Sequence, residues 1–270
     1  MKTVQRIFAN DFGSFFLIAG PCLVESSDIT HRIAEELVNL CSRYDIPLIF
    51  KGSYRKANRT SDESLTGIGD QKALAILESV RDSFDVPILT DVHETTEVLG
   101  VAEVADVLQI PAFLCRQTAL IKAAARSQKA VNIKKGQFMS AESMSHASRK
   151  AKSENNEHIF LTERGTFFGY QDLVVDPRSI YKMAAHDVTI IDVTHATQKP
   201  NQSLGFSGGD PKMAQLLGRV GLSAGAKGIF METHPNPDQA RSDASSMIPL
   251  ERVEQLIVHW KRVAQMLRDL

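Results

Sequence analysis

The chain has 270 residues, of which 43% are hydrophobic, and this suits a single large domain over residues 1–270 with a substantial buried core. Its 31 lysine and arginine residues nearly balance 32 aspartate and glutamate residues, which leaves a formal net charge of -1. The composition excludes the strong positive field of a protein that binds nucleic acid or an acidic membrane. Any anion-binding site must therefore be local.

The three cysteines, Cys22, Cys41 and Cys115, form an odd and sparse set that argues against a disulfide framework and for a reducing compartment. The early apolar stretch FFLIAG runs directly into GPCLVES without a separate cleavage region, so it predicts a strand and not a signal peptide. No apolar run reaches the roughly 18 residues of a membrane span. We expect a soluble, cytoplasmic protein with no membrane partner.

Eight short aliphatic or β-branched runs recur along the chain and predict eight buried strands. They are FFLIAG (15–20), PLIFKG (47–52), PILTDVH (87–93), DVLQIP (106–111), AVNIKK (130–135), IFLTERG (159–165), VTIIDVTH (188–195) and GIFMETH (228–234). Segments with helical spacing, such as 29–44 and 71–84, lie between them. This regular alternation predicts a closed (β/α)8 TIM barrel.

An open, doubly wound sheet is the structural alternative. Such sheets usually carry G-x-G-x-x-G after the first strand, and GPCLVES does not match it. In a barrel, the first dozen residues would form a cap and residues 249–267 an outer helix.

Polar residues follow every predicted strand, at the end of a barrel where catalytic loops lie. In chain order these residues are Cys22 and Glu25; Lys51, Ser53, Lys56, Asn58 and Arg59; Asp91, His93 and Glu94; Gln109 and Arg116; Lys134 and Lys135; Glu163 and Arg164; Asp192 and His195; Glu232 and His234. Lysines and arginines more often lie scattered over solvated helix faces. Because buried charge is costly unless it is paired, this clustering predicts a bound charged substrate.

Eight cationic side chains fall on this face, and they suit a small polyanion. They are Lys51, Arg55, Lys56, Arg59, Arg116, Lys134, Lys135 and Arg164. Arginine binds phosphate and carboxylate with a bidentate fork, while lysine acts as a mobile point charge. Two phosphates and one carboxylate could be accommodated. Some of these cations must be structural, and Lys135 and Arg55 are the first candidates for solvated neighbours.

A second group, Cys22, His195, Glu232 and Asp243, could bind one divalent transition metal. The first, seventh and eighth strands are adjacent in a closed barrel, so these side chains could converge. A thiolate, an imidazole and two carboxylates suit zinc, ferrous iron, manganese or cobalt. Each residue also has an ordinary explanation: a core thiol, a hydrogen-bonded barrel histidine, or carboxylates paired with Arg241. The residues alone leave both interpretations open.

Two long loops are candidates for functional segments. Residues 54–70 mix cations with serine, threonine, asparagine and glycine, which supply phosphate donors. Residues 196–210 contain several glycines and prolines and either close over a substrate as a lid or form an ordinary flexible loop.

Eight motifs occur along the chain in an order that resembles one known family. They are AGPCLVES (19–26), FKGSYRKANRTS (50–61), TDVHE (90–94), LQIPAFLCRQT (108–118), NIKKGQF (132–138), ERGTFFGYQDLVVD (163–176), DVTHATQ (192–198) and METHPNPDQARSDASS (231–246). The chain resembles 3-deoxy-D-manno-octulosonate 8-phosphate synthase, or 2-dehydro-3-deoxyphosphooctonate aldolase. The resemblance implies condensation of phosphoenolpyruvate with D-arabinose 5-phosphate and water, which gives the octulosonate 8-phosphate and inorganic phosphate for lipopolysaccharide synthesis.

The resemblance also implies roles for individual residues. Phosphoenolpyruvate would be held by Lys51, Ser53, Lys56, Gln109, Lys134 and Arg164, and the aldose phosphate by Asn58, Arg59 and Thr60. Arg116 matches a residue that reaches the aldose phosphate of a neighbouring subunit, which implies a homotetramer. Cys22, His195, Glu232 and Asp243 match the metal ligands of the family's metal-dependent branch. The metal-independent branch has asparagine in place of Cys22 and usually Asp-Gly-Pro where this chain has residues 243–245 as Asp-Ala-Ser.

The chemistry requires C3 of the enol to attack the aldehyde, water to add at C2, and phosphate to leave by carbon–oxygen cleavage. We hypothesise that Asp91 and Asp243 bind or deprotonate a sugar hydroxyl or water. Lys56 would protonate a developing oxyanion or the leaving phosphate, and His195 is predicted to be a further catalytic residue.

Three alternatives differ in function. A 3-deoxy-7-phosphoheptulonate synthase would use erythrose 4-phosphate, but its second-strand motif typically reads KPRTS where this chain reads KANRTS at 56–61. A Schiff-base aldolase would use Lys134 as a desolvated nucleophile. A non-catalytic sugar-phosphate sensor would have the same anion site but no need for a thiolate among its ligands.

Overall fold

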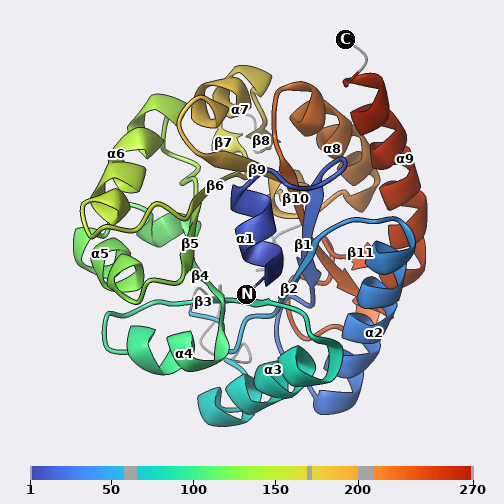
Figure 1. Cartoon of the computed structure of the whole chain (residues 1–270). Helices are drawn as coiled ribbons and strands as arrows, with labels where there is room; N and C mark the ends of the chain where they lie inside the picture. Colours follow the sequence, from blue (N-terminus) through green and yellow to red (C-terminus); the bar gives the residue numbers. More distant parts are fainter. Residues whose placement is uncertain (1, 58–65, 169–171, 200–208, 269–270) are drawn as a thin grey trace.

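Eight parallel strands form a closed barrel in the computed structural model, which describes residues 2–57, 66–168, 172–199 and 209–268 (Figure 1). In order around the barrel they are β1 (Phe16–Gly20), β2 (Leu48–Lys51), β3 (Ile88–Asp91), β4 (Val107–Ile110), β5 (Ala130–Lys134), β6 (Ile159–Glu163), β9 (Val188–Asp192) and β10 (Gly228–His234). Pairing of β1 with β10 closes the barrel, with Phe16 opposite Gly228. The predicted TIM barrel and its eight strand positions are confirmed.

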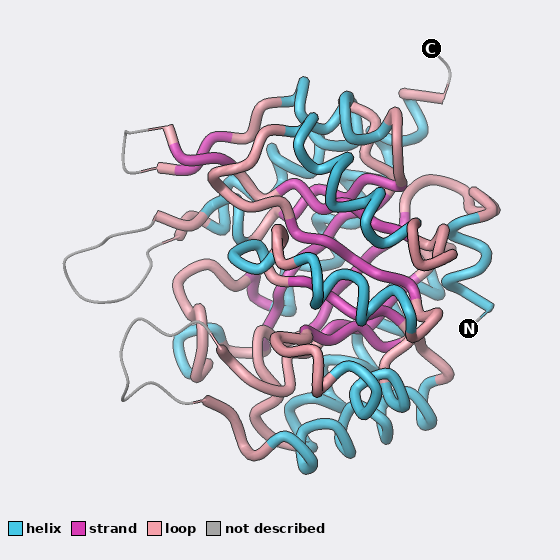
Figure 2. Tube along the Cα trace, turned by 90° about the vertical axis from the view of Figure 1, so that its left-hand side faces the viewer, coloured by secondary structure: helices cyan, strands magenta, loops and turns pink. Residues whose placement is uncertain are grey.

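Helices cover the outside of the barrel, and Figure 2 shows the strands enclosed by them. They are α2 (Ser27–Arg43), α3 (Asp70–Phe84), α4 (Val98–Val104), α5 (Thr118–Arg126), α6 (Ala141–Lys152), α7 (Pro177–Ala184), α8 (Ala214–Ser223) and α9 (Val253–Met266). Side chains of Ser26, Ser140 and Asp176 cap the helices that follow them. The predicted outer helix near the C-terminus is α9, whose buried Trp260 lies against Gly218 of α8.

Shorter elements occupy the connections. They are the hairpin of β7 (Thr166–Phe167) and β8 (Leu173–Val174), strand β11 (Ile248–Pro249), and the 3-10 turns at Ala112–Leu114, His195–Thr197, Pro211–Met213, Pro237–Gln239 and Leu250–Arg252. Among the described residues, no helix combines the length and the apolar character that crossing a membrane would require.

A short N-terminal helix, α1 (Lys2–Phe8), closes the amino-terminal end of the barrel and is visible at its centre in Figure 1. Its buried Val4 and Ile7 join an interior apolar cluster contributed by the early residues of the strands. Phe8 stacks on Phe160, near the start of β6, with ring centroids 4.4 Å apart. The predicted cap is confirmed, and the carboxyl-terminal end of the barrel remains as the open face.

At the end of β1, Gly20 lies so close to the backbone of β2 that no residue with a side chain would fit there. A Cβ atom on Gly20 would lie 1.9 Å from the carbonyl oxygen of Lys51. Glycine at this position therefore allows the chain after β1 to lie against β2, where the Lys51 ammonium donates to the Cys22 carbonyl at 2.8 Å.

The capping helix supplies a stability prediction. Replacing Ile7, which is 1% exposed, with alanine should lower the free energy of unfolding by about 3 kcal/mol, because it removes buried apolar volume at the barrel floor. Denaturant unfolding followed by circular dichroism measures the effect, with Gln5→Ala on the exposed face of α1 as the control. Equal free energies of unfolding of the two variants would mean that packing of α1 on the floor of the barrel does not stabilise the fold.

Candidate active site

The carboxyl-terminal ends of the barrel strands surround a cavity of about 340 Å³. Most of the site residues predicted from the sequence line it, namely Cys22, Lys51, Ser53, Lys56, Asp91, Gln109, Lys134, Arg164, His195, Glu232 and Asp243. Asn58, Arg59 and Thr60 lie outside the described residues, as does the middle of the predicted lid over residues 196–210. The structure thus brings together the residues that follow strands β1, β2, β3, β4, β5, β6, β9 and β10.

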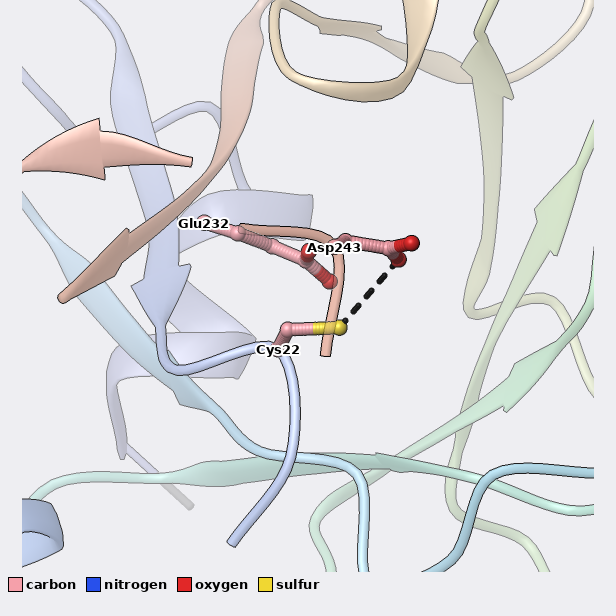
Figure 3. A group of neighbouring side chains, drawn as sticks. All are labelled: Cys22, Glu232 and Asp243. Atoms are coloured by element: carbon pink, nitrogen blue, oxygen red, sulfur yellow. Dashed lines mark hydrogen bonds between the residues drawn. The ribbon is translucent and has the colours of Figure 1, made fainter. Parts of the chain in front are cut away.

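A cysteine and two carboxylates converge on one side of this cavity (Figure 3). One ligand atom from each of Cys22, Glu232 and Asp243 lies within 4.8 Å of the other two. The Cys22 thiol donates to Oδ2 of Asp243 at 3.3 Å. Burial, reinforced by the negative charge of Glu232, raises the pKa of the Cys22 thiol well above its ordinary value.

His195, which follows the neighbouring strand β9, lies beside this group. Its Nε2 atom lies 3.6 Å from Oε1 of Glu232 and 3.9 Å from Oδ2 of Asp243. On the other side of the ring, Nδ1 lies 2.8 Å from Oδ2 of Asp192, while Oδ1 of Asp192 accepts the backbone N–H groups of Thr194 and His195. A carboxylate behind the imidazole is the usual way to orient a metal-binding histidine.

The donor set of these four residues fits a divalent transition metal. It offers sulfur, nitrogen and carboxylate oxygen from residues on or after three adjacent strands, β1, β9 and β10. Oε2 of Glu232 is buried and has no hydrogen-bond partner, so it is free to bind a cation. Cys22 and Glu232 are almost fully buried, which would shield such an ion from solvent.

Two lysines balance the carboxylates of this cluster. The Lys51 ammonium donates to Oε1 of Glu232 at 2.5 Å, and the Lys56 ammonium donates to Oδ2 of Asp243. Burial alone would lower the pKa of both lysines, but the surrounding negative charges outweigh it and raise the pKa. The pKa values of Glu232 and Asp243 are lowered in turn, although burial acts in the opposite direction. The pairs are therefore ionised near neutral pH.

Two further cations approach the cavity from β5 and β6. The Lys134 ammonium pairs with Asp192 and lies 3.1 Å from the ring centroid of Phe230, and burial lowers its pKa to about 8. The Arg164 guanidinium donates through Nη2 to Gln198 at 2.7 Å. Its Nη1 is buried without a hydrogen-bond partner in the structure. An anion in the cavity would satisfy this donor.

A row of buried polar side chains runs beneath the cavity. Ser53 donates to Oδ2 of Asp91 at 2.5 Å, and the Gln109 amide donates to Oδ1. Asn132 donates to Gln109 at 2.8 Å and accepts from Thr162 at 2.6 Å. Sequence reasoning missed the last two residues. The available signal was a polar residue in the middle of each of the apolar runs AVNIK and IFLTE.

The expectation that Lys135 is a solvated neighbour is wrong. Lys135 is fully buried, pairs with Glu163 at 3.3 Å and donates to the Gly165 carbonyl and the Thr166 hydroxyl. It follows Lys134 directly, so strand alternation turns it away from the cavity and toward the β7–β8 hairpin. Arg55 is partly exposed and pairs with Glu97 and Asp70, and these ion pairs support the expected structural role.

Arg116 does not line the cavity of this chain. It lies in a separate surface hollow with Cys115, Phe138 and Lys150, on the connection between β4 and α5. The neighbouring Phe113 and Phe138 are 43% and 58% exposed. The predicted contact of Arg116 with a substrate would therefore require a second subunit.

Comparisons with known proteins agree with this geometry. The sequence matches the DAHP synthetase I family over residues 3–269. It is 49% identical to a 2-dehydro-3-deoxyphosphooctonate aldolase of Acidithiobacillus ferrooxidans over 90% of this chain and 87% of that protein. The protein of the same name from Rickettsia prowazekii is 44% identical over the full length of both chains, and that of Legionella pneumophila is 47% identical over 90% and 89%. The chain therefore belongs to the DAHP synthetase I family and, within it, to the family of the 2-dehydro-3-deoxyphosphooctonate aldolases.

Proposed function

We propose that the protein condenses phosphoenolpyruvate with D-arabinose 5-phosphate and water to give 3-deoxy-D-manno-octulosonate 8-phosphate and inorganic phosphate, in lipopolysaccharide biosynthesis. The names of its relatives support this reaction. The observation that carries the proposal is the cavity itself, in which Lys51, Lys56, Lys134 and Arg164 face a cluster of carboxylates. We take residues 1–270 as one catalytic domain, because α1 and α9 both pack on the same barrel.

In this proposal, Lys51, Ser53, Lys56, Gln109, Lys134 and Arg164 hold phosphoenolpyruvate. The unpartnered Nη1 of Arg164 is a ready donor for its carboxylate or phosphate. Asn58, Arg59 and Thr60 hold the aldose phosphate from the loop after β2. Fixed cations overcome the repulsion between two polyanions and keep C3 of the enol facing the aldehyde, so most of the catalytic effect is orientation and electrostatic stabilisation.

Proton movements fall to the charged residues at the cavity wall. Asp91 and Asp243 are ionised, since their pKa values lie below the ordinary range, so each can accept a hydrogen bond from a sugar hydroxyl or from the water that adds at C2 but is a weak base toward it. Lys56 carries the proton that would neutralise the aldehyde oxyanion or the leaving phosphate. Its raised pKa makes it a strong electrostatic stabiliser and a reluctant proton donor.

We also propose that Cys22, His195, Glu232 and Asp243 bind one divalent transition metal, either zinc, iron, manganese or cobalt, as in the metal-dependent branch. Such an ion would act as a Lewis acid toward the aldehyde oxygen or lower the pKa of a bound water. Asp192 would hold His195 in the binding orientation through Nδ1. The residues Asp-Ala-Ser at 243–245 agree with the same branch.

We further propose a cytoplasmic homotetramer in which Arg116 reaches the active site of a neighbouring subunit. Phe113, Phe138 and Phe168 are large apolar side chains that are exposed in this chain, and subunit contact would bury such side chains. Cys22, Cys41 and Cys115 are free thiols, in agreement with a reducing compartment. The substrates are small molecules, and the nearly balanced charge gives the protein no overall positive field for nucleic acid.

The alternatives receive less support. A 3-deoxy-7-phosphoheptulonate synthase would have a different motif after the second strand. The similar relatives are named 2-dehydro-3-deoxyphosphooctonate aldolase instead. The pKa of Lys134, lowered to about 8, would suit a Schiff-base nucleophile, but its ammonium is engaged by Asp192. A non-catalytic sugar-phosphate sensor leaves the thiol and carboxylate cluster without a purpose.

The choice of acceptor tests the proposed reaction directly. With phosphoenolpyruvate present, the protein should release inorganic phosphate at least about 100-fold faster with D-arabinose 5-phosphate than with erythrose 4-phosphate at equal concentrations. The reason is that the loop after β2 would bind the phosphate of the longer aldose while its aldehyde faces the enol. A coupled phosphate assay measures both rates. Preference for erythrose 4-phosphate would contradict the proposal.

Metal removal tests the second proposal. Chelation should abolish phosphate release by the parent protein, and added divalent metal should restore it. Cys22→Ala should retain less than one equivalent of metal by atomic emission and lose about 100-fold or more in activity, since a direct ligand matters more than its supporting residues. Cys41→Ala, which removes a buried thiol from α2, is the control. Full activity of the chelated, metal-free parent would rule out metal dependence.

Removal of the Lys56 ammonium tests its proposed role. Lys56→Ala should lower kcat about 100-fold at saturating substrates, because the mutation removes a positive charge from the developing oxyanion. The exposed lysine of α3 provides the control variant Lys72→Ala. Unchanged turnover of Lys56→Ala would exclude both the acid and the electrostatic role.

A further inference from the structure

The row of buried polar residues beneath the cavity connects five consecutive strands or strand ends. Asp91 of β3, Gln109 of β4 and Asn132 of β5 are direct partners in the strand register, so their side chains lie side by side. Ser53 joins this row after β2, and Thr162 joins it from β6. Every link is a hydrogen bond between side chains, from the Thr162 hydroxyl at one end, through the Asp91 carboxylate, to the Ser53 hydroxyl at the other.

The direction of these hydrogen bonds is set from the Asp91 end, because a threonine hydroxyl can either donate or accept. An ionised carboxylate only accepts, so Gln109 must present its NH2 group to Asp91 and its oxygen to Asn132. Asn132 must then present its own oxygen to Thr162, whose hydroxyl donates. If the Thr162 hydroxyl were removed, the buried Asn132 oxygen would lose its donor, and the Asn132 side chain, which donates to the Gln109 oxygen, would be held less firmly in place.

Only some members of the row meet the cavity. Asp91 and Gln109 line it, whereas Asn132 and Thr162 are fully buried and do not. Nε2 of Gln109 carries two hydrogens, of which Asp91 accepts one, so the second is available to a ligand. If the amide turned over, a carbonyl oxygen would face an anionic ligand and repel it.

We propose that Asn132 and Thr162 are positioning residues, which hold the Gln109 side chain in place so that its amide can donate a hydrogen bond to the anionic substrate. This inference rests on the proposed function for the identity of that substrate, phosphoenolpyruvate. The two residues act through Gln109 and do not contact the substrate. Their loss should therefore weaken substrate binding without loss of the fold.

The test compares substitutions at two buried threonines, one whose hydroxyl takes part in the row and one whose hydroxyl does not. Thr162→Val keeps the shape of the side chain and removes the hydroxyl, and Thr162→Ser keeps the hydroxyl. Thr90→Val on β3 is the matched control, because Thr90 is equally buried and its hydroxyl has no hydrogen-bond partner in the structure. We expect Thr162→Val to raise the KM for phosphoenolpyruvate about tenfold, and Thr162→Ser and Thr90→Val to stay within about twofold of the parent.

A double-mutant cycle provides a second measurement. Asn132→Leu should raise the KM for phosphoenolpyruvate by a similar factor, and the double variant Asn132→Leu/Thr162→Val should be no worse than Asn132→Leu alone, because both break the same row. Thermal unfolding of all variants is measured alongside. A parental KM for Thr162→Val, independent effects that add in the double variant, or equal damage in Thr90→Val would each overturn the inference.

Failure of the proposed function is recognised separately. Calorimetric titration with phosphoenolpyruvate alone needs no turnover and no aldose. If the parent binds phosphoenolpyruvate but does not react with arabinose 5-phosphate, the proposed reaction is wrong. The calorimetric affinities of the variants for phosphoenolpyruvate, relative to the parent, then still decide the role of the row. If the parent does not bind phosphoenolpyruvate, both the reaction and this positioning role are wrong.

Discussion

The buried ion pair between Lys51 and Glu232 is the interaction on which the open face of the barrel depends. It joins β2 to β10 across β1, and the same ammonium holds the carbonyl groups of Pro21 and Cys22. An unpaired charge at this depth would be very costly, so each side chain is stable there only because the other is present. The thiol of Cys22 takes its place beside Glu232 as a consequence. The geometry of the cluster thus follows from charge compensation between neighbouring strands.

Charge compensation also explains how one small cavity can contain both cations and anions. Lys56 faces Asp243, Lys134 faces Asp192, and Arg164 keeps one donor nitrogen without a partner. A substrate anion that enters competes for cations that are already oriented, so little reorganisation is needed when it binds. The same pairs keep the carboxylates ionised, and ionised carboxylates are the form that binds a metal or accepts a proton.

Much of this arrangement could be predicted from the sequence. The eight apolar runs placed the strands, because interior strands of a barrel are buried on both sides and carry few polar residues. The residues at their carboxyl ends then had to share one face, which brought Cys22, His195, Glu232 and Asp243 together. Lys135 was misjudged because its charge suggested solvent, whereas strand alternation buries it against Glu163. Asn132 and Thr162 were overlooked because a polar residue within an apolar run has no partner that sequence spacing can identify.

The closure of the barrel by β1 and β10 has a consequence for how the protein is made. Cys22 and Asp243 lie 221 positions apart along the chain, yet they are in direct contact. Contacts between such distant segments form late, because a long loop must be closed before they contribute stability. During synthesis, the thiol of Cys22 therefore emerges from the ribosome long before Glu232 and Asp243 exist to enclose it. A nascent chain of this protein carries an unprotected cysteine until its last strand is in place.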